Sequence, residues 1–419
     1  MVLNLHKSFL INLAAFFCMI PYVAPFPVET DIQYPVIVFC GLIFLIDVFK
    51  KRIRFNNFEL YFLLLAILSL FYINPFNDFQ YLIPKRVALF SAFLIFFVFS
   101  RYWIFINPKY LLAGVLINFS ASILQLFNPD LFEYFSAFIG RAFTMSGLSF
   151  NDGSGWRGLT GLSSEPAYLG GLSLVYFFVG YILWCERRIS KKIFLVFSTI
   201  AIMLNILSLS GTSAVMLFFV IFSLIIFSKI AFHYKLFCFL GFLFTLLLLI
   251  YSFGGFSITG AGESTPFRSF SVFHLVLHPF DFISKDYSAS LRAMSIVVGV
   301  ESMIQGNIFG NGIGTLGFVA TDIMEGSSIK NLFVSSIMAD GREKESFSAL
   351  GLYLTELGLL FIILLVWLYS RPLKSHYTKI VRIPIFLFIL SAFSIMFPPF
   401  WMLMAVTEKR VDFYKNQFS

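Results

Sequence analysis

Charged residues are scarce in this chain. Asp, Glu, Lys and Arg make up 12% of its 419 residues, whereas hydrophobic residues reach 59%. A soluble domain carries about 25% charged residues, so this chain has too few to cover a water-exposed surface. The lipid bilayer is then the expected solvent for much of the molecule. The sequence predicts an all-α, polytopic integral membrane protein with a single domain over residues 1–419.

Patterns that indicate a disulfide framework, a metal site or a nucleotide cofactor are also lacking. All four cysteines lie in or beside apolar runs and none lies in a long loop, so no disulfide framework is indicated. The stretch 306–317 is rich in glycine but has neither a GK[ST] motif nor a strand–turn–helix context. His274 and His278 have the i, i+4 spacing of metal ligands, but without a third ligand such a pair is typical of an interface. We therefore expect no cofactor and no metal.

Long apolar runs are what the chain does have. Eleven of them reach the roughly 17 to 25 residues needed to cross the hydrocarbon core. Pro398 and Pro399 fall inside the last run, and a break there brings the possible number of transmembrane helices to between ten and twelve. The expected spans are 9–26, 32–49, 58–74, 87–105, 110–127, 166–185, 193–209, 212–231, 236–253, 347–369 and 381–405.

The basic residues predict how these spans are oriented. With the N-terminus in the cytoplasm, four short basic segments fall on the cytoplasmic side, as the positive-inside rule requires. The net charge of +8 then reflects these segments and their contact with anionic lipid. No stripe of basic residues interleaved with aromatics is present, so we expect no nucleic-acid partner. The four segments are 50–54, 186–192, 228–235 and 371–379.

Two long loops fall on the opposite, extracytoplasmic side. The first covers residues 128–165 and the second covers residues 254–346. Loops of this length are uncommon without a function. Within the second loop, the apolar segments 271–280 and 290–305 are expected to form helices that lie along the membrane surface or dip into it.

The stretch RGLTGLSSEPAYLG at 157–170 closes the first loop. Ser164, Glu165 and Pro166 make a good helix N-terminus, with Ser164 as the N-cap and Glu165 in the first turn. That interpretation needs no function, but it does not explain Arg157. Arg157, Ser164 and Glu165 are therefore also candidates for ligand binding or catalysis.

Arg292 precedes the glycine-rich stretch GNIFGNGIGTLG at 306–317. Glycines permit tight turns and a close approach of the backbone to a ligand. A guanidinium stays charged and matches phosphate oxygens in a bidentate way. We therefore expect Arg292 to contact an anionic ligand from the second loop.

Glu345 and Glu356 lie at the entry to the tenth predicted span. They are eleven residues apart, so on a helix they share one face, about 16 Å apart. Glu356 would lie inside the bilayer, where an ionisable residue is costly and typical of a functional site. The alternative is a protonated Glu356 that is hydrogen-bonded between helices. Arg342 is a further cation on the outer side.

Arginines and glutamates thus converge on the outer face of the membrane. A pocket of this kind suits an amphiphile with its lipid tail in the bilayer and a diphosphate at the surface. Arginines would stabilise the diphosphate as a leaving group, and a carboxylate would deprotonate an attacking hydroxyl. No nucleotide is available outside the cytoplasm, so the energy of the transfer has to lie in the lipid–phosphate bond.

Three stretches resemble the bacterial O-antigen and capsular polysaccharide repeat-unit polymerases, the Wzy-type family. RGLTGLSSEPAYLG resembles the family's Arg-x-x-Gly-Leu-x-Ser-Glu-Pro-Ser signature, although Ala167 replaces the common serine. SLRAM…GNIFGNGIGTLG and SFSALGLYLTELGLL resemble its later arginine–glycine element and the next span. Related O-antigen ligases carry a histidine where Glu345 and Ser346 stand here, which favours a polymerase over a ligase.

The resemblance implies a multi-pass enzyme of the bacterial cytoplasmic membrane, with its active site facing the periplasm or the exterior. It would transfer a growing glycan from undecaprenyl diphosphate to the end of a new lipid-linked repeat unit, without metal. A flippase and a chain-length regulator are possible protein partners. The candidate catalytic residues are Glu165 and Glu345. The candidate substrate-binding residues are Arg157, Ser164, Arg292, Arg342 and Glu356.

Two further classes of function compete with a polymerase. A polysaccharide flippase or another transporter would bind the same lipid-linked ligand, but its charges should lie at the midplane of the membrane, and the inverted repeats of many transporters are not visible here. A polysaccharide-assembly scaffold would have no activity of its own. Substitution of Arg157 or Arg292 by alanine would then leave the polymer length unchanged.

Overall fold

The computed structural model shows a bundle of helices. It describes residues 5–23, 34–72, 79–136, 138–139, 158–208, 210–227, 240–241, 283–284, 287–326, 333, 348–370, 376–390 and 396–408. In these ranges every element of secondary structure is helical, apart from isolated bridge residues such as the pair Val23 and Ile139. The prediction of an all-α protein is confirmed for this part of the chain.

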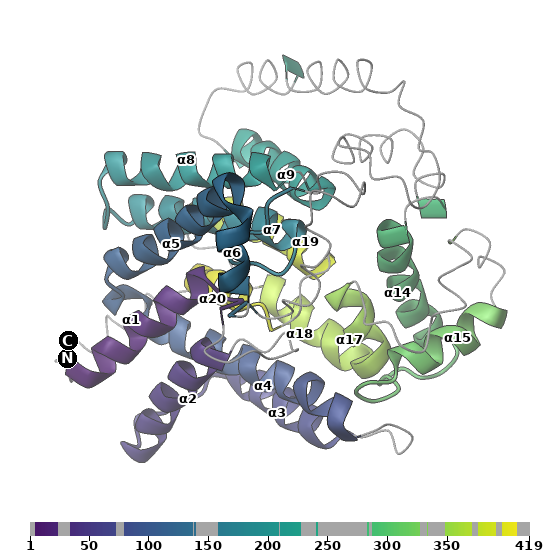
Figure 1. Cartoon of the computed structure of the whole chain (residues 1–419). Coiled ribbons are helices and arrows are strands. Elements are labelled where there is room, and N and C mark those ends of the chain that lie inside the picture. The colour runs from purple at the N-terminus through teal and green to yellow at the C-terminus, as the bar shows by residue number, and fades with distance from the viewer. Residues whose placement is uncertain are drawn as a thin grey trace.

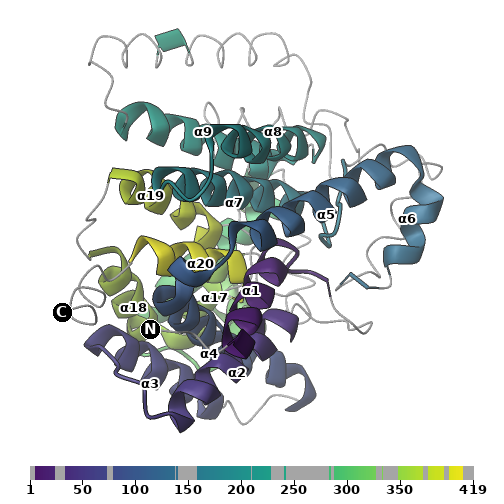
Figure 2. The same ribbon diagram turned by 90° about the vertical axis from the view of Figure 1, so that its left-hand side faces the viewer.

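The helices follow one another along the chain and pack side by side (Figures 1 and 2). The first half of the chain forms α1 (Leu5–Met19), α2 (Tyr34–Phe49), α3 (Asn57–Phe71), α4 (Phe79–Tyr102), η1 (Trp103–Phe105), α5 (Pro108–Phe127) and α6 (Pro129–Ser136). The second half forms α7 (Pro166–Cys185), α8 (Lys191–Leu207), α9 (Gly211–Phe227), α14 (Tyr287–Ile304), α15 (Leu316–Gly326), α17 (Ala349–Leu357), α18 (Leu359–Ser370), α19 (His376–Leu390) and α20 (Pro398–Thr407).

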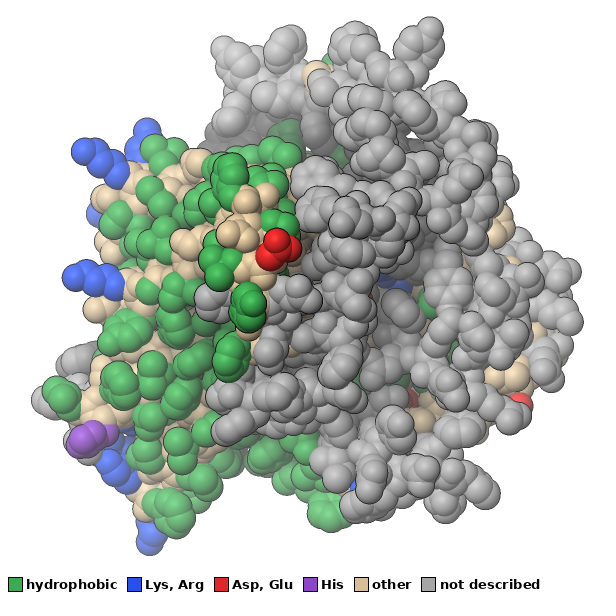
Figure 3. Space-filling view, viewed as in Figure 1, with side chains coloured by type: hydrophobic (Ala, Val, Ile, Leu, Met, Phe, Trp, Pro, Cys, Tyr) green, Lys and Arg blue, Asp and Glu red, His purple; other side chains and the backbone are tan. Residues whose placement is uncertain are grey.

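Three of the described helices are long and apolar enough to cross a membrane, namely Arg86–Phe105, Pro108–Phe127 and Pro166–Cys185. Shorter apolar helices accompany them. Large hydrophobic side chains are exposed along α2, α3 and α8, and Figure 3 shows a broad hydrophobic surface on this side of the molecule. A surface of this kind would be unfavourable in water, so these helices indicate a membrane protein.

Helix α4 lies at the centre of the bundle, between α2, α3 and α20. Phe93, Phe96, Phe97 and Phe99 of this helix are buried on successive faces, which is expected of a helix that is hydrophobic all round. Trp401 of α20 packs its ring 4.9 Å from that of Phe62 and 6.4 Å from that of Phe96. Aromatic contacts therefore join α3, α4 and α20 into one core.

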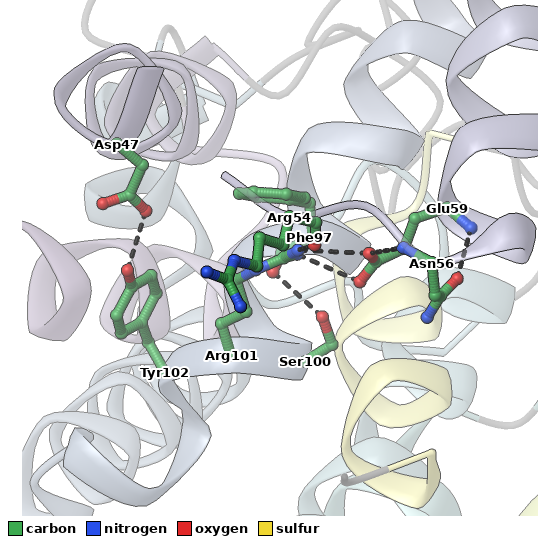
Figure 4. A network of polar contacts seen from close by, with 8 residues as sticks. All are labelled: Asp47, Arg54, Asn56, Glu59, Phe97, Ser100, Arg101 and Tyr102. Atoms are coloured by element: carbon green, nitrogen blue, oxygen red, sulfur yellow. Dashed lines mark hydrogen bonds and ion pairs between the residues drawn. The ribbon is translucent and has the colours of Figure 1, made fainter. Parts of the chain in front are cut away.

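Arg101 connects the end of α4 with the start of α3 (Figure 4). Its guanidinium donates to Glu59 Oε1 at 3.0 Å and to the carbonyl of Arg54 at 2.8 Å, and it lies over the ring of Phe97. Glu59 also forms a capping box with Asn56, which fixes the first turn of α3. One carboxylate thus both begins a helix and ties it to its neighbour.

A second buried network joins α1, α2 and α4. The ammonium group of Lys7 donates to Asp47 and to the hydroxyl of Tyr102, and that hydroxyl donates to Asp47 Oδ2 at 2.7 Å. All three side chains are buried. The ammonium and the carboxylate neutralise each other where water cannot reach them, so each depends on the other.

The turn after α7 joins the same part of the molecule. The indole N–H of Trp103 donates to Glu186 Oε2 at 2.9 Å, and Arg188 donates to the carbonyls of Trp103 and Ile106. Burial lowers the pKa of the Arg188 guanidinium, and the neighbouring Glu186 carboxylate opposes that shift.

These contacts place the starts of α1, α3 and α8 and the ends of α2, α4 and α7 together. We call this the basic end of the bundle and the opposite one the far end. The basic segments 50–54 and 186–192 both lie at the basic end, as the sequence predicts, and Figure 3 shows Lys and Arg side chains along this margin of the molecule. At the far end, Tyr22 stacks on Tyr168 at 5.1 Å and on Phe397 at 6.3 Å.

Two of the predicted spans are broken. The run 347–369 is not one continuous helix, because α17 ends at Leu357 and α18 begins at Leu359, with Gly358 at φ +53° between them. The last predicted span is also divided, and α20 begins at Pro398, where the break was expected. The predicted span 236–253 lies outside the described residues except for 240–241.

The pair of Lys7 and Asp47 gives a first prediction. Asp47→Ala leaves a buried ammonium without its partner and should destabilise the protein by about 3 kcal/mol. The double variant Lys7→Met with Asp47→Leu should recover most of this loss, because it removes both charges. Thermal unfolding of the detergent-solubilised protein measures both effects. Lys109→Ala, at an exposed lysine, is the control. A double variant less stable than Asp47→Ala would contradict the prediction.

Candidate functional site

Residues 158–165, the last part of the first predicted loop, run through the interior at the far end of the bundle. Every residue from 158 to 164 is buried, and Glu165 is partly exposed. The N–H of Leu159 donates to the carbonyl of Leu207 at 2.9 Å, which ties the segment to the end of α8. Loops usually lie at the surface, because their backbone groups need water. This buried course therefore requires partners from within the protein.

Gln125 of α5 supplies the first partners. Its Oε1 accepts hydrogen bonds from the N–H groups of Thr160 at 3.0 Å and Gly161 at 2.9 Å, and its Nε2 donates to Thr160 Oγ1 at 2.9 Å. Gly161 has a φ of +54°, which favours glycine, and an added Cβ would lie 2.7 Å from Asn118 Oδ1. One amide side chain thus replaces water for two backbone groups.

Asn118, two turns earlier in α5, extends this support. Its Oδ1 accepts from the N–H of Leu162 at 2.9 Å, and its Nδ2 donates to the hydroxyl of Tyr176 at 2.6 Å. The hydroxyl of Tyr176 in turn donates to the carbonyl of Met19 at the end of α1. The buried segment is therefore connected through neutral hydrogen bonds to α5, α7 and α1.

The start of α7 differs by one residue from the prediction. Ser164 is not the N-cap, because Glu165 occupies that position with extended backbone angles, and Pro166 is the first helical residue. The physical reason is proline, which disfavours helical angles in the residue before it. Glu165 must therefore stay outside the helix. Its side chain makes no cap hydrogen bond.

The turn between α8 and α9 packs against the first turns of α7. A Cβ added to Gly170 would lie 3.0 Å from Ser208 Oγ and closer still to Ser213, so only glycine allows this approach. Asn205 donates to Ser173 Oγ at 3.2 Å across the same contact. The beginning of α7 is thus surrounded by small and neutral polar side chains.

The glycine-rich stretch 306–315 fills the break between α17 and α18. The N–H groups of Asn311 and Gly312 donate to the carbonyls of Thr355 and Glu356 at 2.9 and 3.1 Å. On the other side of the break, the N–H of Leu359 donates to the carbonyl of Ile308 at 2.8 Å. Where a helix is interrupted in the interior, its free backbone groups cannot bind water and need such partners from the protein. The glycines therefore serve close packing of the protein against itself.

Glu356 takes part in this contact with its side chain. It is buried, and its Oε1 accepts from the N–H of Gly314 at 2.7 Å, just before α15 begins. The side chain of Asn311 completes the junction by donating to Ser302 Oγ at 2.7 Å and to the carbonyl of Thr355 at 3.0 Å. Glu356 thus joins two elements of the protein, and its predicted contact with substrate stays a prediction.

Arg292 lies on α14, the helix predicted within 290–305. Gly299 and Gly351 allow α14 and α17 to approach closely, because a Cβ on Gly351 would lie 2.5 Å from the backbone of Ser295. Arg292 is one turn before Ser295 and about 15 Å along the helix from Ser302, the residue level with the break. Figure 1 places α14, α15 and α17 on the side of the molecule away from the N-terminus.

Tyr72, at the end of α3, attaches the glycine-rich stretch to the rest of the bundle. Its carbonyl accepts from the N–H of Ile313 at 3.3 Å, and its hydroxyl donates to the carbonyl of Gly310 at 3.2 Å. Because α3 starts at the basic end, Tyr72 marks the far end. The stretch 306–315 therefore lies at the same end of the bundle as the segment 158–165.

Three predicted site residues, Arg157, Arg342 and Glu345, lie outside the described residues, as do His274 and His278. Within the described ranges, no group of three His, Cys, Asp or Glu side chains could hold a metal ion.

The sequence analysis missed Gln125 and Asn118, which support the segment 158–164. A signal for them exists, because they are amides seven residues apart on one face of an apolar span. Polar residues on one face of a predicted transmembrane helix indicate a contact inside the protein. Ser163, the neighbour of Ser164 in the same motif, is as buried as Ser164.

Comparisons with protein-family models, with curated proteins and with solved structures found no match to this chain.

The role of Gln125 is open to a direct test. Gln125→Leu removes the acceptor of two buried backbone N–H groups and should destabilise the protein by about 3 kcal/mol. Gln305→Leu, at an exposed glutamine, should change the stability by less than about 0.5 kcal/mol. Chemical unfolding in detergent followed by tryptophan fluorescence compares the two variants. Equal stability of both would contradict the assigned role of Gln125.

Gly306 and Gly310 form a matched pair of positions that tests the packing of the glycine-rich stretch 306–315. Both have positive φ, but a Cβ on Gly306 would meet open space, whereas one on Gly310 would collide with the backbone of Glu356 and Leu357. Gly306→Ala should cost about 1 kcal/mol from backbone strain alone. Gly310→Ala should cost clearly more, because the junction with α17 must open. A difference in melting temperature between the two variants measures the effect, and its absence would contradict the assigned packing.

Proposed function

We propose that this protein is a repeat-unit polymerase for a surface polysaccharide. It works in the bacterial cytoplasmic membrane, with the basic end in the cytoplasm and the far end facing outward. Its substrates are oligosaccharides linked to undecaprenyl diphosphate. It transfers the growing glycan onto the end of a new lipid-linked unit and releases undecaprenyl diphosphate. The transfer needs neither a metal nor a nucleotide.

The observation that carries this proposal is the buried course of residues 158–165 at the far end. It ends in Glu165, which is partly exposed and makes no cap hydrogen bond. A segment of this kind holds its side chains in fixed positions, as a catalytic site requires. Three stretches resemble the polymerase family, and they end at Gly170, Gly317 and Leu360. Their described parts include the buried segment 158–164 and the contact of the stretch 306–315 with the break at Gly358, which both lie at the far end.

Each candidate residue other than Glu356 has a defined task in the proposed transfer. Arg157 and Arg292 bind the diphosphate and stabilise the charge that develops when the sugar–oxygen bond breaks. Glu165 or Glu345 accepts the proton of the attacking hydroxyl of the new unit. Attack from the face opposite the leaving diphosphate inverts the configuration at the sugar carbon. Arg342 and Ser164 are further substrate contacts.

A second candidate function has one observation in its favour. The break between α17 and α18 is a feature of many transporters, whose discontinuous helices bind ligands at their free ends. In this protein the stretch 306–315 occupies both ends of the break. Backbone groups that already bind each other are not available for a transported ligand, so the break favours a structural junction over a transport site.

The two functions are separated by one reaction. Purified protein in lipid nanodiscs is incubated with a synthetic lipid-linked repeat unit, without added metal or nucleotide. A ladder of lipid-linked multimers on a gel supports the polymerase. Movement of the lipid-linked unit across the membrane of liposomes, without a ladder, would favour a transporter. If neither movement nor a ladder is seen, the remaining function is the polysaccharide-assembly scaffold without an activity of its own.

Arg292→Ala should abolish the ladder, because removal of a group that stabilises the leaving diphosphate costs about 10²- to 10³-fold in rate. Arg292→Lys should recover only part of the rate, since lysine keeps the charge but loses the bidentate geometry. Arg52→Ala, at an exposed arginine of the basic end, is the matched control and should leave the ladder intact. A full ladder from a well-folded Arg292→Ala protein would contradict the assignment.

A further inference from the structure

Two buried hydroxyl groups stand directly before α7. Ser163 is 0% exposed and Ser164 is 3% exposed, and within the part of the chain that the structure describes neither Oγ has a hydrogen-bond partner. Buried serines nearby do have partners. Ser122, Ser173 and Ser208 each donate to a backbone carbonyl of their own helix. A buried hydroxyl without a hydrogen-bond partner is unfavourable. Two such hydroxyls in succession therefore indicate a ligand that accepts their hydrogen bonds.

The helix that follows favours a negatively charged partner. Helix α7 has 20 residues, and the aligned peptide dipoles give its start a partial positive charge. Glu165 at the N-cap does not turn its carboxylate to the helix end, so the start of α7 lacks the usual side-chain cap. Helix starts are common binding sites for phosphate groups. In α7, Pro166 has no N–H, and the N–H groups of Tyr168 and Leu169 donate to the carbonyl of Glu165, so the helix contributes its dipole and the serine hydroxyls are the donors.

The groups around the two serines are compatible with an anion. The segment 158–164 is held by the amides of Gln125 and Asn118, which are neutral and already engaged with its backbone. Glu165 is the only acidic residue between 158 and 165, and it is partly exposed. No second carboxylate in the segment competes for the hydroxyl donors.

We propose that Ser163, Ser164 and the first turn of α7 form a binding site for a phosphate group, whose oxygens accept hydrogen bonds from both serine hydroxyls. This inference rests on the proposed function, in which the ligand carries a diphosphate at the far end of the bundle. In this arrangement the two serines and the start of α7 bind one phosphate of the diphosphate, and Arg157 and Arg292 bind the other. Glu165 then stands beside the leaving group, and of the two candidate bases Glu345 is the one left to accept the proton of the hydroxyl that attacks from the opposite face.

The experiment uses the full-length protein in nanodiscs and measures thermal unfolding and binding isotherms. The probes are farnesyl diphosphate, inorganic pyrophosphate and farnesol. The variant is Ser163→Ala with Ser164→Ala. The matched control is Ser122→Ala, which removes an equally buried hydroxyl from α5 that already has a partner.

Wild-type protein should be stabilised by farnesyl diphosphate and not by farnesol. The double serine variant should melt at the same or a higher temperature than wild type without ligand, because it loses two unpaired hydroxyls. Its affinity for farnesyl diphosphate should fall at least about tenfold, since hydrogen bonds to charged groups are the stronger kind. Ser122→Ala should keep the affinity. Stabilisation by pyrophosphate as well would identify the phosphate alone as the ligand, whereas stabilisation by farnesyl diphosphate only would identify a lipid diphosphate.

Three outcomes would overturn the site. They are a lower melting temperature of the serine variant with unchanged affinity, unchanged values of both quantities, and no stabilisation of wild type by either diphosphate. The polymerase is judged separately. If wild type binds a diphosphate through the serines but makes no ladder, the phosphate site stands and the polymerase fails. If it makes a ladder that is the same in the serine variant, the polymerase stands and the phosphate site fails.

Discussion

Backbone polar groups that are removed from water must find partners, and this requirement shapes both irregular segments at the far end of the bundle. Residues 158–164 find them in the amides of Gln125 and Asn118. The break at Gly358 finds them in the stretch 306–315. In each case a non-helical piece of chain is held in the interior by hydrogen bonds to a helix. Polar chemistry can therefore be placed within an apolar protein without a water-filled core.

The two ends of the bundle are stabilised differently. At the basic end, charged groups are paired across helices, as in Arg101 with Glu59 and Lys7 with Asp47. At the far end, the described contacts of the segment 158–164 are made by amides, hydroxyls and backbone groups. Charge pairs at the basic end fix the helices in place, whereas the segment 158–164 at the far end is held by neutral groups.

Much of the fold could be predicted from the sequence, since apolar runs of sufficient length specify helices through composition alone. The break at Pro398 was visible because proline cannot continue a helix. The break at Gly358 was not visible, because a glycine within an apolar run is ordinary. The reason for the break is the close packing of Gly310 against the backbone of Glu356, which the sequence does not show. The start of α7 was placed one residue early, since the preference of serine as an N-cap was weighed above the effect of Pro166 on Glu165. The supports of the candidate site come from α5, far away in sequence, and no local pattern connects them to it.

The attachment of residues 158–164 to α5 and α8 also bears on how the protein is made. The segment follows α5 in the chain but precedes α8, so it leaves the ribosome before the carbonyl of Leu207 that holds Leu159 has been synthesised. Its burial must wait until α8 has inserted and folded back. The region proposed to do the chemistry is therefore completed late, and a chain truncated before α8 would present this polar stretch, unprotected, to the quality-control proteases of the membrane.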